Sequence, residues 1–228
     1  MLSKKKPFFS LKNRAAFKAG STNTLGYLIQ SEYCRDQLQK IHEDILSKMD
    51  QNEILEIEAF SNFLGLVSSN NPEFAVEFVQ NQINIITFNE ENKLKFWKKK
   101  EKPSLTHTGI ILSTIEIFNN SSEKDDLLKN LFVRCQEFLN IPTIKEIIKI
   151  KFIASMFQRA TKCKNFIIQK QDSQKFLQIS TQGLTNDNFN IIRLSIESII
   201  AALNYDNSLI DNYEQISTNL FQALKKIN

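Results

Sequence analysis

Few side chains in this sequence have the chemistry of metal ligands or nucleophiles, and those few are widely spaced. There are two histidines, His42 and His107, and three cysteines, Cys34, Cys135 and Cys163. A zinc site draws on several thiolate or imidazole ligands, commonly with a close pair such as Cys-x-x-Cys, and no such pair occurs. We therefore predict no metal site, and we interpret both histidines as exposed helix or loop residues.

The cysteines are odd in number and far apart, which indicates free thiols in a reducing compartment. Cys135 and Cys163 lie among apolar or basic residues of predicted helices, so we interpret them as packed thiols. A Cys–His pair needs only to meet in space, so an enzyme with an unrecognised site stays open as an alternative. Such an enzyme would have a deep pocket near Cys34 or His42.

Neighbouring acidic residues are the other candidates for catalysis. They are Glu56/Glu58, Glu90/Glu91 and Asp125/Asp126. A general acid or base needs a pKa shifted by burial, whereas these pairs lie in polar stretches and we expect them to be solvated. The five glycines are isolated, so no Gly-rich phosphate loop occurs. The sequence therefore predicts no catalytic residue and no cofactor.

Positive charge is concentrated in two stretches of a chain whose formal net charge is +4. The first precedes the first acidic residue, Glu32, and the second surrounds Trp97 within a loop insert at about 93–104. We expect the first to be a basic arm that becomes ordered when it binds a partner. For the loop we prefer a solvated turn, then protein binding, and last nucleic acid. The loop residues that we select as candidate contacts are Trp97, Lys98, Lys99 and Lys100.

Four stretches carry apolar residues at helical spacing, and a short polar break follows each. The i, i+3, i+4, i+7 pattern places these side chains on one face of a helix. The stripes are Ile57, Phe60, Leu64 and Val67; Ile111, Ile115 and Phe118; Ile150, Ile153, Ala154 and Phe157; and Ile192, Ile196, Ile199, Ile200 and Leu203. The breaks are residues 68–72, 119–122, 159–164 and 204–207. They recur at roughly 40–50 residues, close to the period of HEAT and armadillo arrays.

This pattern predicts an all-α fold, a right-handed α-solenoid of armadillo/HEAT-like repeats with an extended basic N-terminal arm. With 5 glycines and 4 prolines, the chain has too few turn residues for a β-sandwich or barrel. We assign residues 1–50 to the basic arm and a leading helix, and residues 51–228 to the repeat domain. A non-repetitive helical bundle is the alternative.

Hydrophobicity along the chain bears on its location. No apolar run approaches the roughly 18–20 residues that span a bilayer, so we expect no membrane span. The N-terminal stretch lacks the apolar core of a secretory signal, whereas a mitochondrial presequence is harder to exclude. We expect a cytoplasmic or nuclear protein, with the cilium, cytoskeleton or mitochondrion as alternatives.

Several stretches are similar to parts of one known family. Residues 14–20 look like the opening of a basic arm, and residues 38–48 look like its later helical part. Residues 58–72 look like a first armadillo repeat, and residues 115–123 like the end of a second. The order of these features resembles importin-α, an adaptor family that carries nuclear cargo and whose arm binds importin-β. The resemblance implies an importin-β-like receptor bound through Arg14, Phe17, Lys18, Gly20, Leu38 and Lys40.

The sequence departs from this family at the cargo groove. The family's groove uses paired Trp and Asn on the inner helices of successive repeats. The best-matching positions here are Leu112 and Glu116 in the second repeat, and about Phe152 and Met156 in the third. The chain has room for only about four repeats.

We therefore predict a non-enzymatic adaptor that binds other proteins through its arm and its inner-helix face. Glu116, Glu197 and neighbouring inner-helix residues would give that face an acidic groove for a basic peptide. The alternative is a structural scaffold subunit of a large cytoskeletal, ciliary or mitochondrial assembly. Reversible, salt-sensitive binding would favour the adaptor, and co-purification at high salt would favour the scaffold.

Overall fold

The computed structural model describes residues 18–22, 24, 38–92, 105–121, 125–163, 165–209 and 213–227. Every regular element within these ranges is helical. The helices are α2 (Leu38–Lys48), α3 (Ile54–Asn70), α4 (Pro72–Asn92), α5 (His107–Asn120), α6 (Asp125–Gln136), α7 (Glu146–Lys162), α8 (Lys170–Gly183), α9 (Phe189–Tyr205) and α10 (Tyr213–Ile227). Short 3-10 turns at Glu137–Asn140 and Asn207–Leu209 follow α6 and α9. The prediction of an all-α fold is confirmed.

The four predicted apolar stripes lie on α3, α5, α7 and α9. Nearly all of their side chains are buried, as helical spacing toward a core requires. On α9, Ile196 and Leu203 are partly buried against the core. Ile200 is the exception, because it is 52% exposed and shares a side of α9 with Glu197 and Asn204.

The polar breaks between the stripes are shorter than their composition suggests. α3 continues through Ser68, whose hydroxyl donates a 2.7 Å hydrogen bond to the carbonyl of Gly65. α7 continues through Arg159, whose Nη1 donates to the carbonyl of Ser121 at 2.8 Å. Both polar side chains are buried and hydrogen-bonded, and both helices continue through them.

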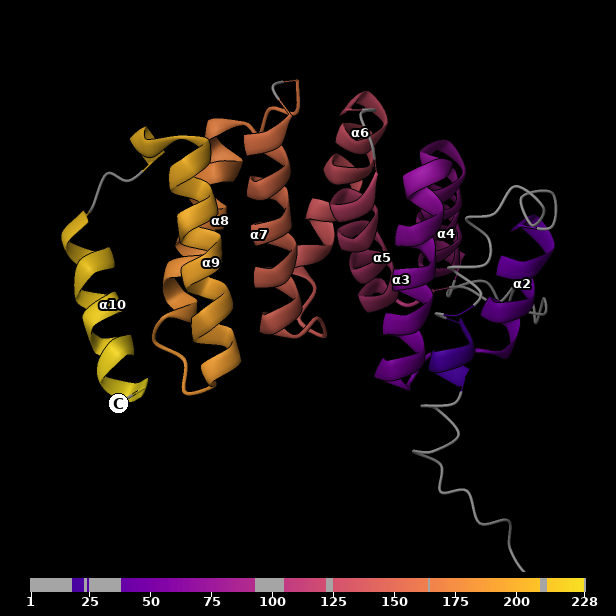
Figure 1. Cartoon of the computed structure of the whole chain (residues 1–228), viewed down its shortest axis with the longest axis horizontal. Coiled ribbons are helices and arrows are strands. Elements are labelled where there is room, and N and C mark those ends of the chain that lie inside the picture. The colour runs from indigo at the N-terminus through magenta and orange to yellow at the C-terminus, as the bar shows by residue number, and fades with distance from the viewer. Residues whose placement is uncertain are drawn as a thin grey trace, which may run out of the picture.

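α3, α5, α7 and α9 lie side by side in a row, each packed against the next (Figure 1). Ser61 on α3 meets Ser113 on α5, with 3.2 Å between their hydroxyl oxygens. One turn further along α3, Gly65 lies against Glu116 of α5. The contacts advance in the same direction along both helices, so α3 and α5 run parallel. The contacts between α5 and α7 given below advance in the same way.

The remaining helices pack against this row. α4 contacts α3 and α5, α6 contacts α4 and α5, α8 contacts α7 and α9, and α10 packs on α9. One cluster of buried apolar side chains extends from Leu46 to Leu209. No helix in the described ranges is both long enough and apolar enough to cross a membrane.

Aromatic rings link the middle of this core. Phe118 of α5 packs on Phe166, with ring centroids 5.8 Å apart, and Phe166 packs on Phe132 of α6 at the same distance. Phe176 of α8 then joins Phe132 to Phe157 of α7 at 6.1 and 6.3 Å. Such ring pairs contribute beyond the area that they bury. The described helices therefore share one continuous core.

Candidate functional site

The exposed side of α3, α5, α7 and α9 carries a series of polar side chains, which we call the open face. On each helix these residues recur after three, four or seven positions, which places them on one side. The open face consists of Glu58 and Asn62 on α3, Glu116 and Asn119 on α5, Lys151 and Gln158 on α7, and Arg193, Glu197 and Asn204 on α9.

Four charged side chains of the open face form two ion pairs. Glu116 Oε1 on α5 lies 3.6 Å from Lys151 Nζ on α7. Arg193 Nη1 donates to Glu197 Oε1 on the same helix at 3.0 Å. Glu116 and Glu197 thus each have a cation beside them, and the acidic groove that we predicted from them and their neighbours stays a prediction. The open face is mixed in charge.

Close packing of the helices positions these groups. A Cβ atom at Gly65 would lie only 2.9 Å from Glu116 Cβ, so glycine allows α5 to approach α3. Between α5 and α7, the hydroxyl of Ser155 donates to Asn119 Oδ1 at 3.0 Å. The contacts Glu116–Lys151 and Asn119–Ser155 therefore fix the two helices in a parallel register.

The predicted groove positions differ in exposure. Glu116 lies on the open face, whereas Leu112, one turn earlier, is 3% exposed and packs in the core. Phe152 and Met156 are fully buried, and the outward residues of α7 are Lys151 and Gln158. Phe152 and Met156 therefore belong to the core of this chain, and the alignment of the third repeat stays a prediction.

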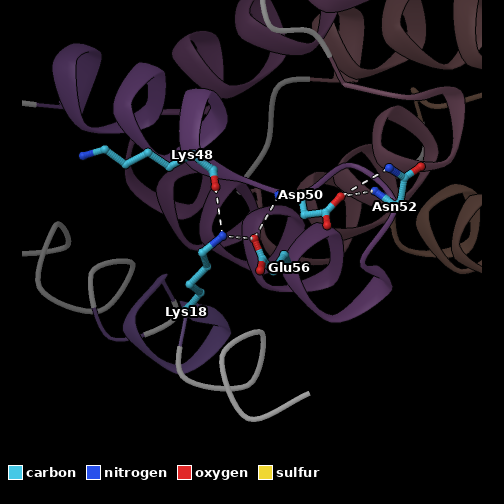
Figure 2. Close-up of polar contacts among 5 residues, drawn as sticks. All are labelled: Lys18, Lys48, Asp50, Asn52 and Glu56. Carbon is cyan, nitrogen blue, oxygen red and sulfur yellow. Dashed lines mark hydrogen bonds and ion pairs between the residues drawn. The ribbon is translucent and has the colours of Figure 1, made fainter. Parts of the chain in front are cut away.

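A second polar cluster lies where residues 18–22 meet α2 and α3 (Figure 2). Lys18 Nζ donates to Glu56 Oε2 and to the carbonyl of Lys48, each at 3.0 Å. That carbonyl ends α2, where the helix dipole favours a cation. The backbone N–H of Asp50 donates to the same oxygen of Glu56 at 2.9 Å.

Glu56 is only 7% exposed, so the prediction that it is solvated was wrong. The turn after α2 folds over the first turn of α3 and supplies the Asp50 N–H, while Lys18 supplies the compensating charge. Glu58, by contrast, is exposed, as we expected. Two glutamates only two positions apart thus lie on different sides of α3.

A cavity of about 200 Å³ opens beside this ion pair. Its lining consists of Lys18, Ser21, Thr22, Asp44, Ile45, Lys48, Met49 and Glu56. Each carboxylate of the lining already faces a lysine, because Asp44 Oδ2 accepts from Lys48 Nζ at 2.7 Å and Glu56 accepts from Lys18. His42 is not part of the lining. The groups gathered here are those of two structural ion pairs.

The histidines take part in aromatic packing. His42 is 6% exposed, and its ring lies edge-on to Phe74 and Phe78 at centroid distances of 5.1 and 4.8 Å. The prediction that it is exposed was wrong, because α4 brings two rings against α2. His107 begins α5 and is partly exposed, and its ring packs on Phe138 at 4.9 Å.

The two cysteines in the described ranges are free thiols. Cys135 is fully buried, with its sulfur 3.2 Å from the hydroxyl of Thr114, which confirms the packed thiol. Burial raises the pKa of Cys135 to about 12, so it is protonated at neutral pH. Cys163 is partly buried against the core. Within the ranges that the structure describes, no three His, Cys, Asp or Glu residues gather in a way that could hold a metal ion.

The predicted arm and loop contacts are only partly within the described ranges. Gly20 is exposed in the helical residues 18–22, and Leu38 and Lys40 belong to α2. The candidates Arg14, Phe17, Trp97, Lys98, Lys99 and Lys100 lie outside the described ranges, as does the insert at 93–104. The sequence reasoning missed Asn62, Lys151, Gln158 and Arg193, although their helical spacing opposite the apolar stripes was a usable signal.

Comparisons of the chain with models of protein families, with curated proteins and with solved structures find no match.

Proposed function

We propose that this chain is a non-enzymatic protein-binding adaptor whose helices α3 to α9 form successive armadillo-like repeats of an α-solenoid. The open face is its binding surface for a partner protein. More specifically, we propose an importin-α-like adaptor that also binds a receptor through its basic N-terminal arm. The observation that carries the proposal is the continuity of the open face across α3, α5, α7 and α9.

The dimensions of the open face suit an extended peptide segment. Packed helices lie about 8–10 Å apart, so four neighbours span roughly 27 Å. At about 3.3 Å per residue, roughly eight residues of extended chain cover that distance. Amide side chains such as Asn62, Asn119 and Gln158 can both donate to and accept from a peptide backbone.

The charge pairs of the open face affect which partner it takes. Because Lys151 and Arg193 accompany Glu116 and Glu197, the face does not select a strongly basic segment. A partner of mixed charge replaces these exposed pairs at small cost, since such pairs contribute only about 0–1 kcal/mol.

The test is affinity purification of the tagged chain with open-face variants. The double variant Asn62→Ala with Gln158→Ala removes two exposed amides without removing charge. We expect it to lose proteins that co-purify with the unchanged chain. The matched control is Asn130→Ala with Gln174→Ala, which removes two exposed amides from α6 and α8, and we expect it to retain them.

The arm requires a separate deletion. Removing residues 1–50 would also remove Lys18 and α2, which contact Glu56 and the core, so the deletion should stop at residue 17. We expect an importin-β-like receptor to bind the full chain and not the shortened one. A fixed set of proteins that stays bound at high salt to every variant would instead make the chain a scaffold subunit.

A further inference from the structure

Large exposed apolar side chains concentrate on the last two described helices. In the ranges that the structure describes, eight such side chains are exposed, and four of them belong to α9 and α10. They are Phe189 at 54%, Ile200 at 52%, Phe221 at 67% and Leu224 at 50% exposure. Phe221 is the most exposed of the eight.

α10 has one wide apolar side, and part of it is uncovered. Ala223 is buried, and Ile216 and Leu220 pack against the core, so these residues form the side that faces α9. Phe221 and Leu224 are one turn apart and form the exposed edge of this apolar side, which we call the outward side of α10. α10 lies at the end of the row, with α9 as the helix that it packs on (Figure 1). In an array of stacked helices, an apolar side of this kind is normally covered by the next unit, and an end unit is polar on its outside.

We infer that the outward side of α10 is a dimer contact with α10 of a second copy of this chain. Charge favours a second copy in antiparallel orientation. Glu214 lies in the first turn of α10 and Lys225 in the last, and both are exposed. An antiparallel pair of α10 helices brings Glu214 of each copy near Lys225 of the other, whereas a parallel pair sets like charges side by side.

The sizes of the side chains fit the same orientation. The middle of α10, which spans Tyr213–Ile227, falls near Leu220 and Phe221. A twofold axis there places Phe221 of one copy beside Phe221 of the other, an aromatic pair at the centre of the contact. The same axis places Leu224 opposite the small Ser217 of the second copy. The contact is therefore self-complementary in both charge and shape. This inference does not depend on the adaptor proposal.

The first test is sedimentation equilibrium of the full 228-residue chain over a range of concentrations. We expect the average mass to rise from monomer toward dimer. Phe221→Glu should weaken the dimer at least about tenfold, because it replaces a buried aromatic contact by a charge. The matched control is Ile167→Glu, which changes a 60% exposed apolar side chain outside α9 and α10 and should leave association unchanged. Leu224→Gln is a second variant if Phe221→Glu loses helicity by circular dichroism.

The second test exchanges the charges. Glu214→Lys alone and Lys225→Glu alone should each weaken the dimer, and the two together should restore it, because the exchange rebuilds both ion pairs. A chain that stays monomeric at every concentration overturns the inference. So does a dimer that tolerates both Phe221→Glu and Leu224→Gln, or one that Ile167→Glu weakens equally. A double charge variant that is weaker than either single variant overturns the antiparallel orientation.

Discussion

At one end of the helical row the chain covers its own apolar surface, whereas at the other end it leaves a comparable surface exposed. α2 covers α4 by placing His42 against Phe74 and Phe78, and Lys18 compensates the buried Glu56 beside it. At the far end, α10 leaves Phe221 and Leu224 largely exposed. In a row of packed helices, each of the two end helices has one side that no neighbouring helix of the row buries. Within the described residues, apolar side chains at one end are thus covered by other segments, whereas Phe221 and Leu224 at the other end are exposed.

The largest expected effect contrasts one phenylalanine from each end. Phe78 is 7% exposed and packs on His42 and Phe60, so Phe78→Ala should lower the free energy of unfolding by about 3–5 kcal/mol. Phe221→Ala should change it by less than about 0.5 kcal/mol in dilute solution, because the ring is exposed there. Urea unfolding followed by circular dichroism measures both. Equal losses would mean that the two ends do not differ as described.

Removing the ion pair between Lys18 and Glu56 should have a smaller effect on the free energy of unfolding. Lys18→Met leaves Glu56 buried with the Asp50 N–H as its remaining donor among the contacts given above, and should cost about 1–3 kcal/mol. Lys48→Met is the control, since its pair with Asp44 is exposed on both sides and should contribute less than about 0.5 kcal/mol. Urea unfolding followed by circular dichroism measures the free energy of unfolding of both variants. A loss with Lys48→Met as large as with Lys18→Met would show that burial of Glu56 is not what matters.

Between the two ends, the buried Cys135 of α6 should make the free energy of unfolding depend on pH. The pKa of Cys135 is raised from 9.0 to about 12 by burial, so between pH 9 and 12 the folded state holds a proton that the unfolded state loses. The stability linked to this thiol is complete below pH 9 and declines as pH rises toward 12. Between pH 7 and pH 10, the unchanged chain should lose about 1.4 kcal/mol more than Cys135→Ala does. Parallel losses in the two proteins would mean that Cys135 opens to solvent without unfolding.

The smallest effect on stability is expected on the open face. The Glu116–Lys151 pair is partly exposed and its charged atoms are 3.6 Å apart, so Lys151→Met should change the free energy of unfolding by less than about 0.5 kcal/mol. If this surface binds a partner of mixed charge, the same variant should nevertheless alter co-purification. A large loss of stability would identify the pair as part of the scaffold and weaken its assignment as a binding surface.

Local spacing was sufficient to predict the principal helices. The stripes that predicted α3, α5, α7 and α9 involve neighbours three or four residues apart, and such contacts form within a single helix. The same spacing also indicated which side of each helix faces the core. Composition was less informative about where a helix ends. Residues 159–162 are polar or small and were predicted as part of a break, but they belong to α7. The buried Arg159 donates a hydrogen bond to the carbonyl of Ser121, which lies 38 positions earlier in the chain.

By itself, the sequence determined that this protein is helical, where its main helices lie and which of their sides are apolar, since these depend on periodicity within one segment. Only the tertiary structure decided that Glu56 and His42 are buried, that Lys151 lies beside Glu116, and that α10 has exposed apolar side chains. Lys18 and Glu56 are 38 positions apart, and Lys151 and Glu116 belong to different helices. Whether a charged side chain is solvated, paired or buried depends on which distant segment folds against it. The spacing of residues within one helix does not identify that segment.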